Sequence, residues 1–198
     1  MDESKLVFAT DWIELATAVV AAIGLGLTVY SIRDASHRAS RERKAALEQA
    51  QQDLKWRQTV EAQAAIRRLL DDKRAFEAMT MLDWDGQTFP VGETNAHITS
   101  SDIVDALKAT GSFTAVQAFI RAGMDSLFNH LELIQQAIDA RIFKLEDVVF
   151  PIEYYIRKME QIDLDTFAKY MTKFDFAKSD RLISAILALQ RAHAKRGA

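Results

Sequence analysis

The side chains that could carry chemistry are few, and the densest group lies in residues 128–132, Phe-Asn-His-Leu-Glu. Asn129, His130 and Glu132 place an amide, an imidazole and a carboxylate close together on a segment that otherwise looks core-forming. Enzymes use such groups for proton transfer, and a binding pocket is a related interpretation. A polar contact between helices is the simpler one, because buried polar groups are normally hydrogen-bonded. Three arginines of the preceding long helix would be suitable partners for the carboxylate of Glu132: Arg57, Arg67 and Arg68.

The remaining candidates for chemistry do not form a site. The four histidines fall in four different segments, without the helical spacings that metal sites need: His37, His97, His130 and His193. The chain has no Cys, which excludes disulfides, thiolate zinc sites and cysteine nucleophiles. It also lacks a phosphate-cradling Gly-rich loop and a nucleophile elbow. The sequence therefore predicts no catalytic residue, no metal and no cofactor.

Composition favours an all-α protein. Only 7 Gly and 2 Pro interrupt 198 residues that are rich in strong helix formers. The formal net charge of -3 provides no overall attraction to nucleic acid, so we expect no nucleic-acid partner.

Residues 15–32 form an apolar run of 18 residues without an ionisable side chain. With Trp12 and Ile13 the run reaches the ~20 residues that a transmembrane helix needs. Trp12 and Tyr30 fall near its two ends, where amphipathic rings prefer the headgroup regions. A buried helix of a soluble bundle is the first alternative, but the run is apolar on every face. A cleaved signal peptide is the second, but the run has no basic start. An uncleaved transmembrane helix is the leading prediction.

The flanks of this run give it an orientation. Residues 1–14 contain one basic residue, Lys5, whereas five follow the run: Arg33, Arg38, Arg41, Arg43 and Lys44. Because basic residues mark the cytoplasmic side, the N-terminus is expected outside and the rest inside, in a bacterial inner membrane. The same basic cluster could attract anionic membrane lipid, although a topology signal alone explains it.

Small residues within the run suggest a packing stripe. Ala18, Ala22 and Gly26 recur every four residues, and such a stripe permits close approach of a second helix. Chance in an Ala-rich segment explains the pattern equally well. Self-association is therefore an expectation that the sequence alone does not decide.

The expected architecture has four parts: an extracytoplasmic N-terminus at 1–14, a transmembrane helix at 15–32, a basic helical stalk at 33–55 and a cytoplasmic helical bundle at 56–194. In the stalk, Leu47 and Leu54 lie one heptad apart, which is too little to establish a coiled coil. One long helix is expected to run to about Leu82, followed by a loop over 83–98 because three Gly and Pro residues cluster there.

Helix signals divide the rest of the bundle. Thr99 with Asp102 predicts a helix start, and Ser112 predicts the N-cap of a central helix over 113–140. Gly123 of that helix is expected at a close contact. Further helices are expected over 145–161, over a short segment capped by Asp163 or Asp165, and from about Ser179.

Several short motifs resemble an uncharacterised family of bacterial and phage single-span proteins with a cytoplasmic helical domain. These motifs are Trp56-Arg57, Phe76-Glu77-Ala78, Met81-Leu82-Asp83-Trp84, the 128–132 segment and Ile142-Phe143. The resemblance covers about 35–160 and implies the same architecture. It implies no activity, and the usual Gly-containing turn after the central helix is here Ala140-Arg141.

Three functions remain open. The preferred hypothesis is a non-enzymatic, membrane-anchored accessory or scaffold protein that binds a protein partner or self-assembles. The second is a membrane-bound sensor or effector in phage defence or envelope stress. The third is an enzyme that uses the region of Asn129, His130 and Glu132.

Overall fold

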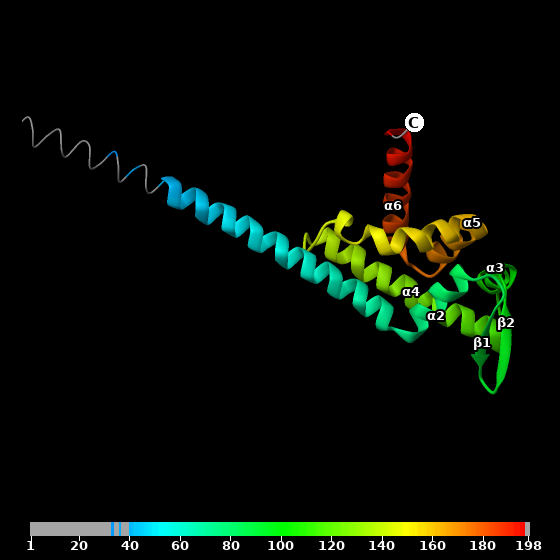
Figure 1. The fold of residues 1–198 in the computed structure, drawn as a ribbon. Coiled ribbons are helices and arrows are strands. Elements are labelled where there is room, and N and C mark those ends of the chain that lie inside the picture. Colours follow the sequence, from blue (N-terminus) through cyan, green and yellow to red (C-terminus); the bar gives the residue numbers. More distant parts are fainter. Residues whose placement is uncertain (1–32, 34–35, 37–39, 197–198) are drawn as a thin grey trace, which may run out of the picture. The chain divides into compact units, whose positions relative to one another are not determined.

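The fold is known from a computed structural model that describes residues 33, 36 and 40–196 (Figure 1). The chain divides into two compact units, Met1–Leu54 and Lys55–Ala198. Residues 40–54 of the first unit are helical, and Leu47 and Leu54 are exposed there. The second unit begins with a helix over residues 55–71, here called helix 55–71. The elements that follow are α2 (Lys73–Asp83), β1 (Gln87–Val91), β2 (Thr94–Ile98), α3 (Ser100–Lys108), α4 (Ala115–Asp139), the 3-10 turn η1 (Leu145–Asp147), α5 (Val149–Lys173) and α6 (Ala177–Arg196).

The expectation of a membrane-spanning protein is wrong for the part of the chain that the structure describes. None of the helices within 33, 36 and 40–196 combines the length and the apolar character that crossing a membrane requires. The reason is visible in α4 and α5, which have 25 residues each but carry charged side chains along their length. The fold class is corrected to a mostly helical domain with a small sheet, and a single-pass location in the inner membrane is not supported. The run at 15–32 itself lies outside the described residues.

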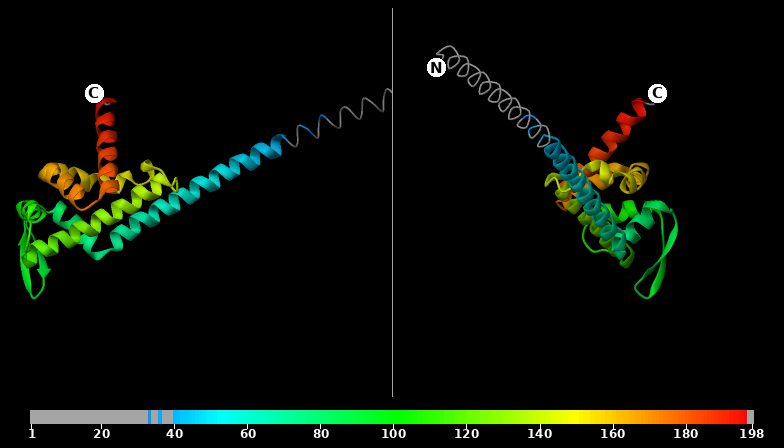
Figure 2. Two further views of the ribbon diagram at one scale, coloured as in Figure 1. Left: turned by 180° about the vertical axis from the view of Figure 1, so that it is seen from behind. Right: turned by 60° about the vertical axis from the view of Figure 1, so that its left-hand side comes forward.

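The long helix expected to run to Leu82 is interrupted at Asp72, although no Gly or Pro stands there. The carboxylate of Asp72 accepts a hydrogen bond from the backbone N–H of Ala75 at 2.8 Å, which makes Asp72 the N-cap of α2. An aspartate cap offers a new helix start to the chain, because it satisfies a backbone donor that would otherwise be unpaired. Helix 55–71 and α4 then lie side by side and run in opposite directions (Figures 1 and 2).

The predicted loop over 83–98 contains a β-hairpin. Strands β1 and β2 pair antiparallel, with Phe89 opposite Ala96, and a two-residue turn at 92–93 joins them. Gly92 adopts φ +63°, which the first central position of such a tight turn requires and glycine allows. Phe89 is buried, with its ring 5.9 Å from that of Phe119 in α4, and the free end of the hairpin projects from the domain (Figure 1).

Helix α4 is the central helix, as the periodicity predicts. Its N-cap is Thr114 rather than Ser112, and Thr114 and Gln117 exchange two hydrogen bonds in a capping box. The buried side of α4 meets α2, α3 and α6, and Phe128 lies at the centre with no exposed surface. The predicted close contact at Gly123 is confirmed: a Cβ there would lie 3.3 Å from the carbonyl oxygen of Arg74 in α2.

Helix α3 begins where the sequence predicts. Thr99 is its N-cap, and its backbone N–H donates to the carboxylate of Asp102 at 2.8 Å. At the other end of α3, the guanidinium of Arg121 donates to the carbonyl oxygens of Ala106 and Ala109 at 3.1 and 3.3 Å. Arg121 is only 8% exposed, and its charge is partly compensated by the rings of Phe113, Tyr170 and Phe174, at 4.3 to 4.9 Å. This buried arginine therefore ties α3 to α4 and α5.

Candidate functional site

The three residues of the predicted polar cluster do not converge. Asn129 is exposed, while His130 and Glu132 serve two separate contacts. The carboxylate of Glu132 accepts a hydrogen bond from the backbone N–H of Ser179 at 2.7 Å, in the first turn of α6. The hydroxyl of Ser179 in turn donates to the carbonyl oxygen of Phe128 at 2.7 Å. Glu132 thus binds a helix start, and none of the predicted arginine partners forms a described ion pair with it.

His130 belongs to a second contact, which is centred on Asp72. Its Nε2 lies 3.6 Å from one carboxylate oxygen of Asp72, and the hydroxyl of Ser126 donates to the other at 2.9 Å. The hydrogen bond from Ala75 lowers the pKa of Asp72, and Ser126 and His130 lower it further. Aspartate, serine and histidine meet here, but both partners bind the aspartate rather than each other. The arrangement suits a helix cap better than an activated nucleophile.

A small pocket lies beside His130. It encloses about 90 Å³ and is lined mostly by apolar side chains, including Leu133, Ile134 and Phe143. Within the described part of the chain, no three His, Cys, Asp or Glu residues are grouped so that they could hold a metal ion. The region of Asn129, His130 and Glu132 therefore shows no arrangement of catalytic groups that would support the enzyme hypothesis.

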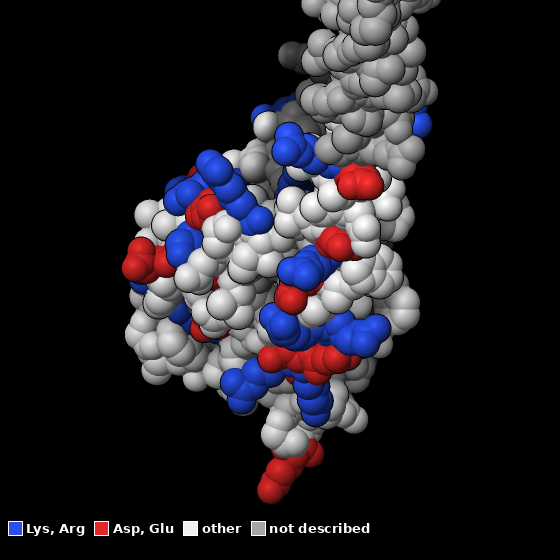
Figure 3. Space-filling view, turned by 90° about the vertical axis from the view of Figure 1, so that its left-hand side faces the viewer, with Lys and Arg blue, Asp and Glu red and all other residues white. Residues whose placement is uncertain are grey.

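Other predicted site residues are partly outside the structure. The stripe of Ala18, Ala22 and Gly26 lies outside the described residues, and so does Arg38 of the basic cluster. The described members of that cluster are all exposed: Arg33, Arg41, Arg43 and Lys44. On the face shown in Figure 3, Lys and Arg side chains are interspersed with Asp and Glu side chains, which is not the single-sign surface typical of nucleic-acid binding.

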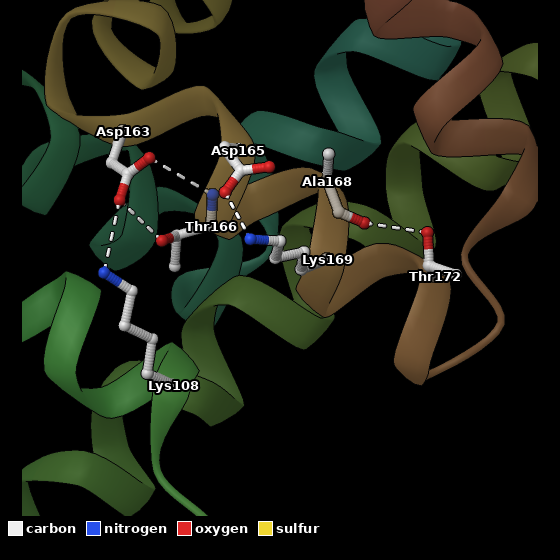
Figure 4. A network of polar contacts seen from close by, with 7 residues as sticks. All are labelled: Lys108, Asp163, Asp165, Thr166, Ala168, Lys169 and Thr172. Atoms are coloured by element: carbon white, nitrogen blue, oxygen red, sulfur yellow. Dashed lines mark hydrogen bonds and ion pairs between the residues drawn. The ribbon is translucent and has the colours of Figure 1, made fainter.

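A lysine-lined pocket lies where α5 is kinked. Asp163 leaves helical geometry there, and its carboxylate accepts hydrogen bonds from the backbone N–H and the hydroxyl of Thr166, at 3.3 and 2.6 Å (Figure 4). The pocket encloses about 200 Å³, and its lysines are Lys108, Lys169 and Lys173. Two of these charges are already compensated, because Lys108 pairs with Asp163 at 3.4 Å and Lys169 with Asp165 at 2.6 Å. These contacts fix the kink and leave little attraction for an added anion.

The largest of these concavities is an apolar groove between helix 55–71 and α5, here called the α5 groove. It encloses about 390 Å³. Helix 55–71 lines it with Ile66, Leu69 and Leu70. Helix α5 lines it with Phe150, Tyr154 and Tyr155. Phe150 is 84% exposed, the highest value among the large hydrophobic side chains of the described residues, and Leu70 is 45% exposed. An exposed aromatic ring beside an apolar concavity is typical of a docking surface.

Neighbouring polar contacts hold the α5 side of this groove in place. The phenol of Tyr154 donates a hydrogen bond to the carboxylate of Asp83, at the end of α2. The ammonium group of Lys158 donates to the backbone carbonyl of Asp83 at 3.3 Å. A cation at a helix C-terminus is favourable, because it meets unpaired carbonyl groups there. These contacts therefore fix the position of α5 against α2, and Phe150 takes no part in them.

The sequence does not predict this groove. The apolar positions 150, 152, 155 and 156 favour a buried side chain for Phe150, and Pro151 predicts either a new first turn or a kink in the helix expected over 145–161. Proline stands in the first turn of α5, where the missing backbone donor costs nothing. Spacing alone gave no signal that Phe150 lies on the open side of the helix.

Comparisons with protein-family models, with curated proteins and with solved structures found no match for this chain. The resemblance to a family of single-span proteins stays a prediction.

Proposed function

We propose that the domain formed by the second unit is a non-enzymatic docking module that binds a protein through the α5 groove. This proposal keeps the protein-binding part of the sequence-based hypothesis and leaves out its membrane part. The observation that carries it is the exposure of Phe150, at 84%, beside an apolar groove of about 390 Å³. Water contact with so much aromatic surface is unfavourable, and a partner surface that covers it would gain that free energy.

The chemistry of the groove supports docking over catalysis. Its charged residues, Glu153 and Arg157, form an ion pair with each other at 3.7 Å. The hydrogen bond to Asp83 raises the pKa of Tyr154, and burial raises the pKa of Tyr155. Both phenols therefore stay protonated near neutral pH, and neither is poised to act as a base. A groove of this kind offers an apolar contact area and a rim that can form hydrogen bonds. Protein interfaces use both.

A photo-crosslinking amino acid at position 150 tests the proposal in cells that produce the full chain. We expect a discrete covalent adduct with a polypeptide on irradiation. The same amino acid at position 133 is the matched control, since Leu133 is an exposed apolar residue of α4 and does not line the groove.

A second variant links the adduct to the groove. Leu70→Glu places a charge in the groove at a half-exposed position, so the domain is expected to fold while the adduct from position 150 is lost. If position 150 yields no discrete adduct, or the same adducts as position 133, the docking proposal is wrong.

A further inference from the structure

We infer that the occupant of the α5 groove is a second copy of this chain, with Phe150 of each copy seated in the groove of the other. The inference rests on the proposed function and names its partner. It follows from three properties of the surface, which are its shape, its helical spacing and its charge.

The shape is self-complementary. Phe150 projects into solvent, while Leu70 and Tyr154 beside it are more enclosed, at 45% and 38% exposed. A projecting ring and an apolar hollow therefore lie next to each other on one face of one molecule. A two-fold axis pairs a patch with itself, so each projection meets the hollow of the other copy. A surface that had only a projection, or only a hollow, could not pair with a second copy of itself about such an axis.

The spacing suits the packing of one helix against another. Phe150, Tyr154 and Arg157 follow one another at intervals of four and three residues, which places them on one face of α5. On the opposite wall, Ile66, Leu69 and Leu70 have the same kind of spacing along helix 55–71. Two such ridges leave a channel that accepts the ridge of a third helix. In a second copy, α5 itself presents that ridge.

The charge of the groove permits two identical surfaces to meet. Its lining holds one acidic and one basic side chain, Glu153 and Arg157, so the lining has no net charge. A surface with charges of a single sign would repel its own copy, because like charges brought together across an interface are costly.

Sedimentation equilibrium of the full chain measures this association directly. We expect a concentration-dependent dimer, and Phe150→Ala should raise its dissociation constant roughly 30-fold, the effect of an aromatic hot spot. Leu133→Ala is the matched control and should leave the constant unchanged, because Leu133 is exposed but lies on α4, outside the groove. At concentrations well below the dissociation constant of the parent dimer, thermal unfolding of both variants should match that of the parent chain, since neither side chain is buried in the monomer.

Cross-linking locates the contact. The chain contains no Cys, so each introduced thiol is unique. At protein concentrations above the raised dissociation constant, a mixture of Phe150→Cys copies and Leu70→Cys copies should form a heterodimer with a short bis-maleimide, because the Leu70→Cys copy keeps its own Phe150. A mixture of Leu133→Cys and Leu70→Cys copies should form none.

The outcomes separate this inference from the proposed function. A chain that stays monomeric, or a dimer that Phe150→Ala leaves intact, overturns the second copy as the occupant. If position 150 then still yields a photo-adduct with a different polypeptide, the docking function stands. Absence of every adduct overturns both.

Discussion

The backbone N–H of Ser179, in the first turn of α6, donates a hydrogen bond to the carboxylate of Glu132 in α4 across 2.7 Å. An acidic side chain from one helix therefore binds the N-terminus of another, where unpaired donors and the helix dipole favour negative charge. We expect Glu132→Ala to lower the free energy of unfolding by about 1 to 2 kcal/mol, because it leaves a part-buried donor unpaired. Urea denaturation of the full chain measures this change.

Glu160→Ala is the control for this prediction. Glu160 forms an exposed ion pair with Arg191, at 3.5 Å, and such pairs contribute little. If Glu132→Ala costs no more than Glu160→Ala, then Glu132 does not stabilise the start of α6.

The cap of α2 predicts a dependence of stability on pH. The N–H of Ala75 lowers the pKa of Asp72 below its ordinary value of 3.8, and Ser126 and His130 contribute. Because the folded-state pKa is the lower one, this stabilisation is present above the unfolded-state pKa and is lost as pH falls through the folded-state value. Asp72→Asn is the matched variant, since asparagine caps helices about as well but does not titrate in this range.

We expect the parent chain to be more stable than Asp72→Asn above about pH 5, and this difference to shrink as the pH falls below about 4. Urea unfolding of both proteins at several pH values checks it. A difference that stays constant over this range would show that Asp72 is not the titrating group.

These two contacts also show what the sequence could predict. The spacing of apolar residues and the pair Thr99 and Asp102 predicted α3 and α4, because amphipathic periodicity and capping boxes are local signals. The break at Asp72 was missed, since an aspartate inside a helix-forming run stops the helix only if its cap is favoured by contacts from elsewhere. Here those contacts are Ser126 and His130, which are more than fifty residues away.

The hairpin was missed for a different reason. Three Gly and Pro residues indicated a loop, but Phe89, Val91 and Ile98 are buried at alternating positions on either side of a Gly-Glu turn. That short alternation is a strand signal. The partner of Glu132 and the exposure of Phe150 could not be predicted from local spacing, because both depend on how distant helices pack.

The turn after α4 yields a stabilising substitution. Arg141 adopts φ +58°, a left-handed conformation, and the next residue, Ile142, donates from its backbone N–H to the carbonyl of Ala137 at 3.0 Å. This pattern closes a helix end, and glycine is the residue best suited to its left-handed position. We expect Arg141→Gly to raise the free energy of unfolding by about 1 kcal/mol, because a side chain is unfavourable at this φ.

Ala140→Gly is the opposite control at the neighbouring position. Ala140 has φ -76° and ψ -1°, where a side chain causes no strain, so glycine there should destabilise by a few tenths of a kcal/mol up to about 1. Thermal unfolding would contradict the assignment of strain to Arg141 if both substitutions shifted the midpoint in the same direction.

The close approach of α2 and α4 at Gly123 predicts the sharpest loss of stability. A Cβ at this position would lie 3.3 Å from the carbonyl oxygen of Arg74 and 3.3 Å from the terminal methyl of Met81. The methyl can move, but the backbone carbonyl cannot without shifting α2. Gly123→Ala should therefore change stability by less than about 1 kcal/mol, since better helix propensity offsets the crowding. Gly123→Val should cost about 2 kcal/mol or more, because its added methyl groups force the helices apart.

Ala118→Val tests whether the effect of valine comes from this contact. Ala118 is an exposed residue of α4, where a β-branched side chain costs only about 0.5 kcal/mol of helix propensity. Urea denaturation of the three variants separates propensity from packing, because valine loses helix propensity relative to alanine at position 118 but not relative to glycine at position 123, where only packing can be lost. Equal losses for Gly123→Val and Ala118→Val would mean that α2 and α4 are not in close contact at Gly123. A larger loss for Gly123→Val would place the constraint at the contact of α4 with Arg74, Ala78 and Met81 of α2.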